Sequence, residues 1–257
     1  MSTITRRQFL KLGAASLASL AWPVCAVQAA APTAKAIFSG DPTLPRLALT
    51  FDDGYVNVTR FLDVCREVNV RLTLFPIGQV VEANPAPWQR AVADGHEIGC
   101  HTYWHQPLGG QPYETVANEL SEFMRVARSC LGLNTVPYFR PPCGSGWSEP
   151  ALQQAAADFG MTVVMWNRVN KMNQSPNPTG RDVLSSFCQQ VKAGDMFLYH
   201  FRYQEVDALA AIVEFCRGKD WQVGTVSELL GRIVPSTLAE MFIESRRAKP
   251  VGAMEPV

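Results

Sequence analysis

The sequence of 257 residues has no excess of charge of either sign. Lysine and arginine together number 23, as do aspartate and glutamate, so the formal net charge is zero. Binding to nucleic acid depends on a basic face that neutralises phosphates, and we therefore expect no nucleic-acid partner. A neutral substrate, small or polymeric, suits this composition better.

Three further patterns are missing. The sequence contains neither GxGxxG nor GxxxxGK[ST], which argues against a nucleotide-binding fold. Its seven cysteines include no CxxC pair, which argues against a structural zinc site of thiolates. For the six that follow the amino-terminal segment, buried free thiols are expected in most cases, although some could form disulfides in an oxidising compartment. The apolar stretch near the amino terminus spans about ten residues, too few for a membrane span, so no stable span is expected once that segment is removed.

The amino-terminal segment has the features of an export signal. Arg6 and Arg7 form a twin arginine, which the apolar stretch Leu12 to Ala21 and the small-residue sequence AVQAA follow. This pattern predicts a cleavable twin-arginine signal over residues 1–29, although an amphipathic terminal helix would also fit. We therefore expect the twin-arginine translocase as a partner during export and a periplasmic or secreted mature protein.

Short apolar runs then alternate with longer helical periods. The predicted strands are 46–51, 71–75, 97–100, 137–140, 161–166, 196–201 and 221–225. The predicted helices are 57–68, 85–94, 113–131, 148–159, 180–192, 205–217 and 226–233. Thr179 with Asp182 and Thr225 with Glu228, at capping-box spacing, support the starts of two of them. Seven alternations predict an α/β fold with a parallel sheet, as an incomplete or distorted (β/α)7 barrel. The expected divisions are a leader at 30–44, a catalytic domain at 45–233 and a carboxyl-terminal helix and tail at 234–257.

Candidate site residues follow four of these strands, where chemistry gathers in barrels of this kind. In TFDDG, a turn at Gly54 would let Asp52 and Asp53 converge despite strand alternation. His101 and His105 follow the strand EIGC, and a spacing of four would place both imidazoles on one face of a helical turn, where they could share a metal ion.

Two more candidates complete the set. Arg140 precedes two prolines, so a rigid extended backbone can aim its guanidinium at a carboxylate, and His200 ends the strand MFLYHF. Each segment alone could be structural, as turn aspartates, surface histidines or a core histidine. His96 precedes its strand and is expected to be structural. Because all four segments end predicted strands, together they favour a site for metal-assisted hydrolysis.

Four segments together resemble the polysaccharide deacetylases, carbohydrate esterase family four, also called the NodB-homology domain. They are TFDDG, GHEIGCHTYWH, FRPPCG and LYH, and the resemblance covers roughly residues 45–232. It implies that Asp53, His101 and His105 hold one divalent metal ion, usually zinc, with cobalt, manganese or nickel as alternatives.

The resemblance also implies roles for the remaining candidates. Asp52 would be the general base, Arg140 would orient it, and His200 would be the general acid. The backbone N–H of Cys143 would stabilise the oxyanion, and Trp166 is a candidate for stacking on a sugar ring. The implied activity is removal of N-acetyl groups from a GlcNAc-containing polysaccharide or oligosaccharide by metal-activated water.

The sequence departs from the family in two motifs. Cys143 stands where the third motif usually has a tyrosine, and the fourth motif, usually rich in aspartate, reads MWNRVNKMNQ without an acid. An asparagine there could accept a hydrogen bond from His200 but could not stabilise an imidazolium by charge, so weaker activity or a shifted pH optimum is expected.

Three other interpretations remain open from the sequence. The same site could hydrolyse a small non-sugar amide. The missing acid could mark a catalytically weakened carbohydrate-binding protein. Two histidines and a carboxylate could instead hold iron in a redox enzyme, although Asp52 and His200 would then have no evident role.

Overall fold

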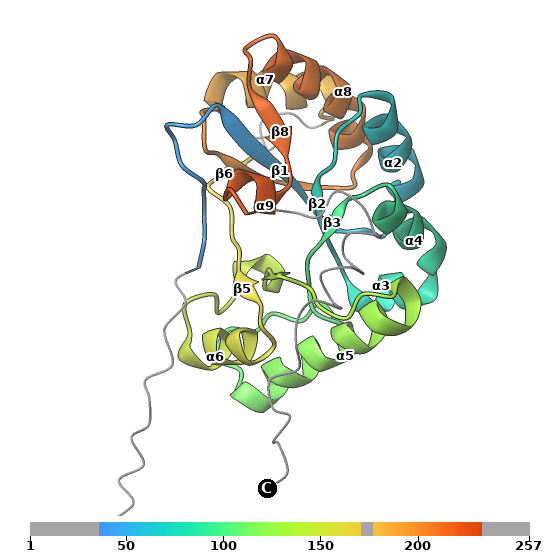
Figure 1. The fold of residues 1–257 in the computed structure, drawn as a ribbon, viewed down its shortest axis with the longest axis vertical. Helices are drawn as coiled ribbons and strands as arrows, with labels where there is room; N and C mark the ends of the chain where they lie inside the picture. The colour runs from blue at the N-terminus through green and yellow to red at the C-terminus, as the bar shows by residue number, and fades with distance from the viewer. Residues whose placement is uncertain (1–35, 171–176, 233–257) are drawn as a thin grey trace, which may run out of the picture. The chain divides into compact units, whose positions relative to one another are not determined.

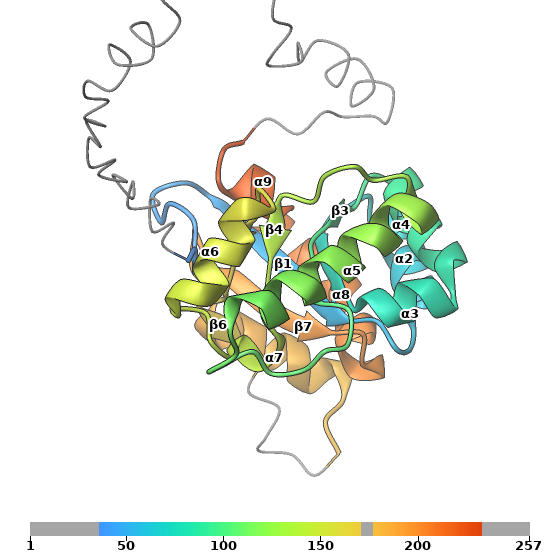
Figure 2. The same cartoon turned by 90° about the horizontal axis from the view of Figure 1, so that it is seen from below.

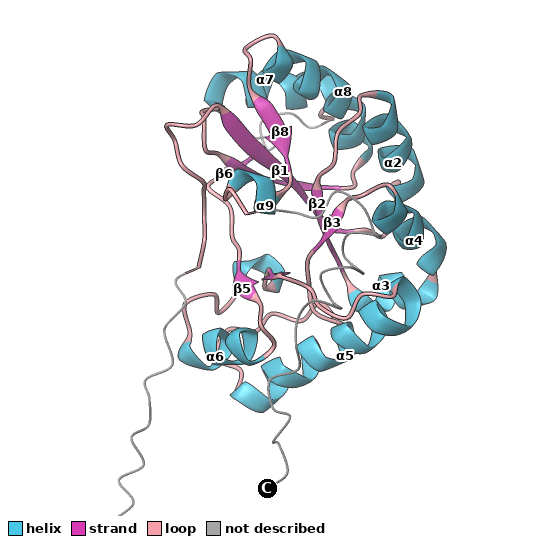
Figure 3. Cartoon of the chain, in the orientation of Figure 1, coloured by secondary structure: helices cyan, strands magenta, loops and turns pink. Residues whose placement is uncertain are grey.

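A computed structural model describes residues 36–170 and 177–232. The predicted export signal and carboxyl-terminal helix lie outside these residues. In the described part of the chain every paired strand runs parallel to its neighbours (Figure 3). The main sheet has the order β3-β2-β1-β7-β6, with β8 also paired to β1, and β4 pairs with β5 in a second sheet.

The described strands comprise the seven predicted ones, close to their predicted ranges, and one more. They are β1 (Arg46–Asp53), β2 (Thr73–Pro76), β3 (Glu97–Ile98), β4 (Tyr138–Phe139), β5 (Thr162–Val163), β6 (Arg168–Val169), β7 (Met196–His200) and β8 (Gln222–Gly224). The two sheets meet at an isolated parallel bridge between Cys100 and Phe139. The barrel is not closed, and the predicted α/β class with an incomplete barrel is confirmed.

Strand β1 lies at the centre of the sheet. Ala48 pairs with Met196 on one side and Gly224 on the other, whereas Thr50 pairs with Leu198 and Thr73. Strands β8 and β2 therefore share one edge of β1, and β7 lies along the other. Because all of these pairings are parallel, the carboxyl ends of β1, β2 and β7 meet at one edge of the sheet.

Helices pack against one another in the order α7, α8, α2, α4, α5 and α6 (Figures 1 and 2). Their bounds are α2 (Val58–Glu67), α3 (Gly78–Ala83), α4 (Pro85–Ala93), α5 (Tyr113–Leu131), α6 (Pro150–Asp158), α7 (Gly180–Gln190), α8 (Tyr203–Arg217) and α9 (Val226–Leu229). Among the described residues, no helix is both long and apolar enough to cross a bilayer.

All seven predicted helices are present, and two of their start signals are confirmed in detail. Thr179 with Asp182 and Thr225 with Glu228 form complete capping boxes at α7 and α9. The sequence interpretation missed β6 and α3. Strand β6 has two residues, one of them charged, and α3 has six, fewer than two helical turns, so neither repeats a hydrophobic pattern.

An aromatic cluster with rings from α2 and α4 packs against the carboxyl end of β1. Phe51 packs against Phe61 at 4.5 Å between ring centroids, and Phe201 contacts Trp88 at 5.8 Å. Gly54 sits directly on this cluster with φ +95°, and an added Cβ would lie 2.2 Å from the Trp88 ring. Only glycine therefore fits where the chain leaves β1.

The six cysteines within the described residues are all free. Cys65, Cys100 and Cys216 are buried, and burial raises the pKa of each thiol. The expectation of free buried thiols is thus met for these three, whereas Cys143 is exposed.

Candidate metal centre

The two aspartates of TFDDG reach the same site because the backbone turns at the second one. Asp52 is buried in the protein interior, with 3% of its surface exposed. Asp53 has φ +76°, outside the β region, so its side chain does not point to the opposite face as strand alternation would require. The turn therefore begins at Asp53 itself, one residue before Gly54.

The two histidines converge through a different geometry from the one predicted. Residues 101–105 do not form a helical turn; Thr102 and His105 instead have φ of +65° and +61°. The Thr102 hydroxyl accepts a hydrogen bond from the His105 N–H at 3.0 Å, and the two imidazole centroids lie 4.9 Å apart. The helical assignment was wrong because a spacing of four residues also suits a tight turn with left-handed residues.

A carboxylate on the neighbouring helix holds this turn in place. Glu119 of α5 accepts hydrogen bonds from the backbone N–H groups of both Tyr103 and Trp104, each at 2.9 Å. Nothing in the sequence pointed to Glu119, because it lies in an ordinary amphipathic helix 15 and 16 residues after its partners.

Asp53, His101 and His105 form a group that could hold a metal ion. One ligand atom from each lies within 4.8 Å of the others. Asp53 Oδ1 is 3.2 Å from His105 Nε2 and 3.5 Å from His101 Nε2, yet this buried oxygen has no aligned hydrogen-bond donor among the described residues. Burial raises the pKa of Asp53, but the neighbouring imidazoles outweigh it and hold the pKa well below its usual range.

The tautomer of His101 also suits a metal ligand. Its Nδ1 lies 2.7 Å from the carbonyl oxygen of Arg140, a group that can only accept, so Nδ1 carries the proton. The lone pair of Nε2 is then free on the side of Asp53. An unpaired carboxylate oxygen and an oriented imidazole fit a divalent transition ion with His and carboxylate ligands.

Arg140 lies where the sequence predicted, at the carboxyl end of β4 and against Asp52. It is fully buried, and its Nη1 donates to Asp52 Oδ1 and to the Thr50 hydroxyl, each at 2.7 Å. Its other donors reach the carbonyl oxygens of Val164 and Met165. Thr50 was not singled out from the sequence, although strand alternation places it on the same face as Asp52.

His200 ends β7 beside the other candidates, with Nε2 3.8 Å from Asp53 Oδ2. Burial lowers its pKa, against the charges of Asp52 and Asp53, which raise it. Glu205 of α8, also unforeseen, is buried and accepts a hydrogen bond from the His200 backbone N–H at 3.0 Å. Burial raises the pKa of Glu205 to about 7.

Asn167, the first of the three asparagines in the fourth motif, hydrogen-bonds to residues other than His200. The Asn167 amide donates to Asp195 Oδ1 at 2.7 Å and accepts from the Met196 N–H at 2.8 Å. Among the described residues no side chain hydrogen-bonds the imidazole of His200. Asn173, the last asparagine of that motif, lies outside the described residues.

Cys143 follows β4 in the chain, and Trp166 follows β5. Cys143 is exposed in a 3-10 turn (Pro142–Gly144) with φ +56°, and its N–H has no described acceptor outside that turn. Trp166 is half-buried and packs over the Arg140 guanidinium at 5.6 Å, so part of its ring is committed to Arg140. His96 is structural as predicted: its Nδ1 accepts from the Leu72 N–H.

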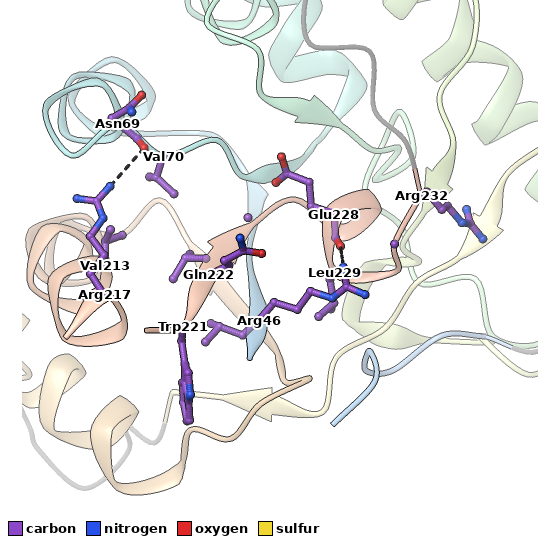
Figure 4. A pocket seen from close by; sticks show the side chains of 14 residues that line it. Arg46, Asn69, Val70, Val213, Arg217, Trp221, Gln222, Glu228, Leu229 and Arg232 are labelled. Atoms are coloured by element: carbon purple, nitrogen blue, oxygen red, sulfur yellow. Dashed lines mark hydrogen bonds between the residues drawn. The ribbon is translucent and has the colours of Figure 1, made fainter. Parts of the chain in front are cut away.

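The structure has a hollow of about 540 Å³ at the opposite edge of the sheet, beside the amino end of β1 (Figure 4). Arg46, Arg217 and Trp221 are among its lining residues, and Arg46 donates to the carbonyl oxygen of Glu228. None of the predicted site residues lines it. We therefore assign the chemistry to the carboxyl edge.

Comparisons with known proteins identify the family of this chain. A family model described as polysaccharide deacetylase matches residues 39–164. A peptidoglycan-N-acetylglucosamine deacetylase of Bacillus cereus is 30% identical over 190 residues, which cover 72% of this chain and 87% of that protein. The chain belongs to the polysaccharide deacetylase family.

Solved structures of this polysaccharide deacetylase family share the fold. A family 4 acetyl xylan esterase from Clostridium thermocellum, in complex with a cobalt ion, superposes with a TM-score of 0.64 at 26% identity, covering 72% of this chain and 89% of that one. A family pseudoenzyme from Bacillus anthracis gives a TM-score of 0.71 at 23% identity, covering 78% and 71%. The solved structures thus include one described with a bound metal ion and one described as a pseudoenzyme.

Proposed function

We propose that this chain is a metal-dependent hydrolase that removes N-acetyl groups from a GlcNAc-containing polysaccharide or oligosaccharide. The observation that carries the proposal is the convergence of Asp53, His101 and His105 on one point, with Asp52 and His200 beside them. In a member of the polysaccharide deacetylase family, that combination supplies a cation site, a base and an acid at one edge of the sheet.

Asp53 Oδ1 and the Nε2 atoms of His101 and His105 would hold the ion, which we propose to be zinc, with cobalt, manganese or nickel as alternatives. Three protein ligands leave coordination positions for water and substrate, as catalytic sites require. When bound, the ion supplies positive charge that polarises an acetyl carbonyl and makes a water molecule more acidic.

Asp52 is positioned to take the proton of the attacking water. Its Oδ1 is occupied by Arg140 at 2.7 Å, whereas its Oδ2 faces the site, 3.8 Å from His101 Nε2. The buried guanidinium neutralises the carboxylate and fixes its plane, so one oxygen serves as the anchor and the other as the base.

His200 would protonate the departing amine nitrogen. Its side chain is 31% exposed, so substrate can reach the imidazole. The N–H of Cys143 would stabilise the negative charge that develops on the acetyl oxygen. The products are a free amino sugar and acetate.

We also propose that the chain works in the periplasm or outside the cell after export by the twin-arginine translocase. The support is the twin arginine at Arg6 and Arg7 with the apolar stretch and small residues that follow. Cell fractionation of wild type and of the Arg6→Lys, Arg7→Lys double variant tests this. Retention of the variant alone in the cytoplasm is expected, and equal export of both would refute it.

The activity is tested by metal analysis together with acetate release. Wild type and Asp52→Asn are assayed on chitooligosaccharides, peptidoglycan and poly-GlcNAc, with and without a chelator. We expect about one divalent ion per chain in both proteins. Acetate release is expected only from metal-loaded wild type. Absence of bound metal, even after reconstitution, would contradict the proposed site.

A carbohydrate-binding protein that has lost catalysis is the second candidate. The observation that favours it is the lack, among the described residues, of any side chain that hydrogen-bonds the His200 imidazole. Metal binding and glycan binding without acetate release from any substrate would establish this alternative.

A further inference from the structure

The hollow beside the amino end of β1 has an excess of positive charge. Arg46, Arg217 and Arg232 line it, whereas Glu228 is the single acid among the described residues of its lining. The Glu228 carboxylate already has a counterion, because its Oε1 accepts from Arg71 Nη2 at 2.9 Å. The charge of the lining arginines is therefore not balanced from within the hollow.

Arg46 is the arginine with the fewest partners. Its side chain extends from β1 to α9, where Nη1 donates to the carbonyl oxygen of Glu228 at 3.0 Å (Figure 4). Its Nε is buried without an acceptor, and no carboxylate in the described part of the chain forms an ion pair with it. A Cβ at Gly231 would lie 3.3 Å from Nη2, so glycine there leaves space beside that nitrogen. A half-buried guanidinium without a counterion is costly, and a bound anion would offset the cost.

Other unpaired donors line the same hollow. The side-chain amides of Asn69 and Gln222 and the indole N–H of Trp221 hydrogen-bond to no other described residue. Arg232 donates to the Tyr138 hydroxyl at 3.2 Å but forms no ion pair with a described carboxylate. Free donors thus outnumber free acceptors, a combination that suits an oxyanion better than a neutral or cationic ligand.

We propose that this hollow, at the edge of the sheet opposite the metal centre, binds a carboxylate or phosphate group. Arg46 provides the main contact through its guanidinium, and Arg232 with the two amides supplies further donors. None of the residues of the proposed metal centre lines the hollow, so this site goes beyond the proposed function and does not depend on it.

Calorimetric titration of the full chain with inorganic phosphate and with succinate, at constant ionic strength, tests the proposal. At least one of the two anions should bind wild type, and the one that binds more tightly identifies the class of ligand. Arg46→Gln should weaken this binding by about ten- to 100-fold, the effect of losing a charge-assisted hydrogen bond. Arg232→Gln leaves the contact between Arg46 and Glu228 in place and should weaken binding by about three- to tenfold. This second variant decides the matter if circular dichroism shows that Arg46→Gln does not fold.

Two controls locate the bound anion. Arg66 of α2 is an exposed arginine that pairs with Asp94 and does not line the hollow, so Arg66→Gln should bind as wild type does. Asp53→Asn removes a proposed metal ligand and should keep the affinity for the anion, because the hollow lies at the opposite edge.

Three results would overturn the inference: no binding of either anion by wild type, equal losses in the Arg46 and Arg66 variants, or loss of binding in Asp53→Asn alone. The last result would place the anion at the metal centre. None of these measurements uses acetate release, so the anion site and the proposed function succeed or fail separately.

Discussion

Arg140 shows how a single residue can connect the fold to the site. Its guanidinium is fully buried and donates to Asp52, to Thr50 and to two carbonyl oxygens of the chain after β5. The Phe75 ring packs on it at 4.1 Å. Each part of the planar group therefore has a partner, and a point charge such as lysine could not replace it.

We predict that Arg140→Met lowers the free energy of unfolding by about 3–5 kcal/mol, because the buried Asp52 carboxylate loses its counterion. Urea denaturation at neutral pH measures the change. Adding Asp52→Asn should recover part of this loss, since no unpaired charge then remains. Strictly additive losses in the double variant would contradict the coupling of the two residues.

His96 makes the stability of the fold depend on pH. Burial lowers its pKa to about 4, so the folded protein holds it neutral while the unfolded chain, with a pKa near 6.5, protonates it. Between these values the unfolded state binds more protons, and stability falls as the pH falls. Glu205, with its pKa raised to about 7, acts in the opposite direction over much of this range.

The variant His96→Asn separates the two effects, because asparagine keeps a neutral acceptor for the Leu72 N–H. We predict that acidification from pH 7 to pH 5 costs wild type about 2 kcal/mol more than the variant. Denaturant unfolding at both pH values measures the difference. An identical pH dependence for the two proteins would show that His96 is not held neutral.

At the scale of elements, the turn at residues 101–105, here called the histidine turn, depends on contacts from α5 more than on its own residues. Glu119 accepts both N–H groups at the centre of the turn, while Thr102 and His105 have left-handed conformations that cost energy in residues other than glycine. The helix therefore supplies the contacts that hold a strained segment in its ligand geometry.

We predict that Glu119→Ala weakens metal binding by about 10- to 100-fold, the usual effect of losing a group that orients ligands. Competition with a chromogenic chelator measures the affinity. Glu122→Ala is the matched control, because Glu122 lies on the same helix and, within the described part of the chain, pairs with Arg125 alone at the surface. Equal affinities in the two variants would show that the turn holds its shape without α5.

At the scale of the whole molecule, residues far apart in sequence meet at the site. Asp53 belongs to β1, the central strand, whereas His101 and His105 follow β3 at the edge of the main sheet. A ligand that joins such segments binds the folded state alone, so metal binding should stabilise the fold as a unit.

We predict that zinc at about 100 times its Kd stabilises wild type by about 2.7 kcal/mol and raises Tm by about 5 to 10 °C. Asp53→Asn should lose most of this rise, whereas Asp63→Asn, on the exposed face of α2, should keep it. Differential scanning calorimetry measures both. The same zinc-dependent rise in Asp53→Asn would place the bound ion elsewhere.

The sequence by itself determined the order of elements and the identity of the converging residues. Hydrophobic alternation located strands such as β1 and β7, and capping residues such as Thr179 located helix starts, because these signals act within a few residues. Asp52, Asp53 and His200 could be placed at one edge because parallel strands bring their carboxyl ends together.

Only the tertiary structure decided how those residues are held. The link from Glu119 to the histidine turn, the orientation of Asn167 toward Asp195 and the contact of Glu205 with His200 join different elements. The left-handed turn at Thr102 is stabilised by neighbours that no local pattern reveals. Such contacts depend on packing between segments, which local propensity and periodicity do not encode.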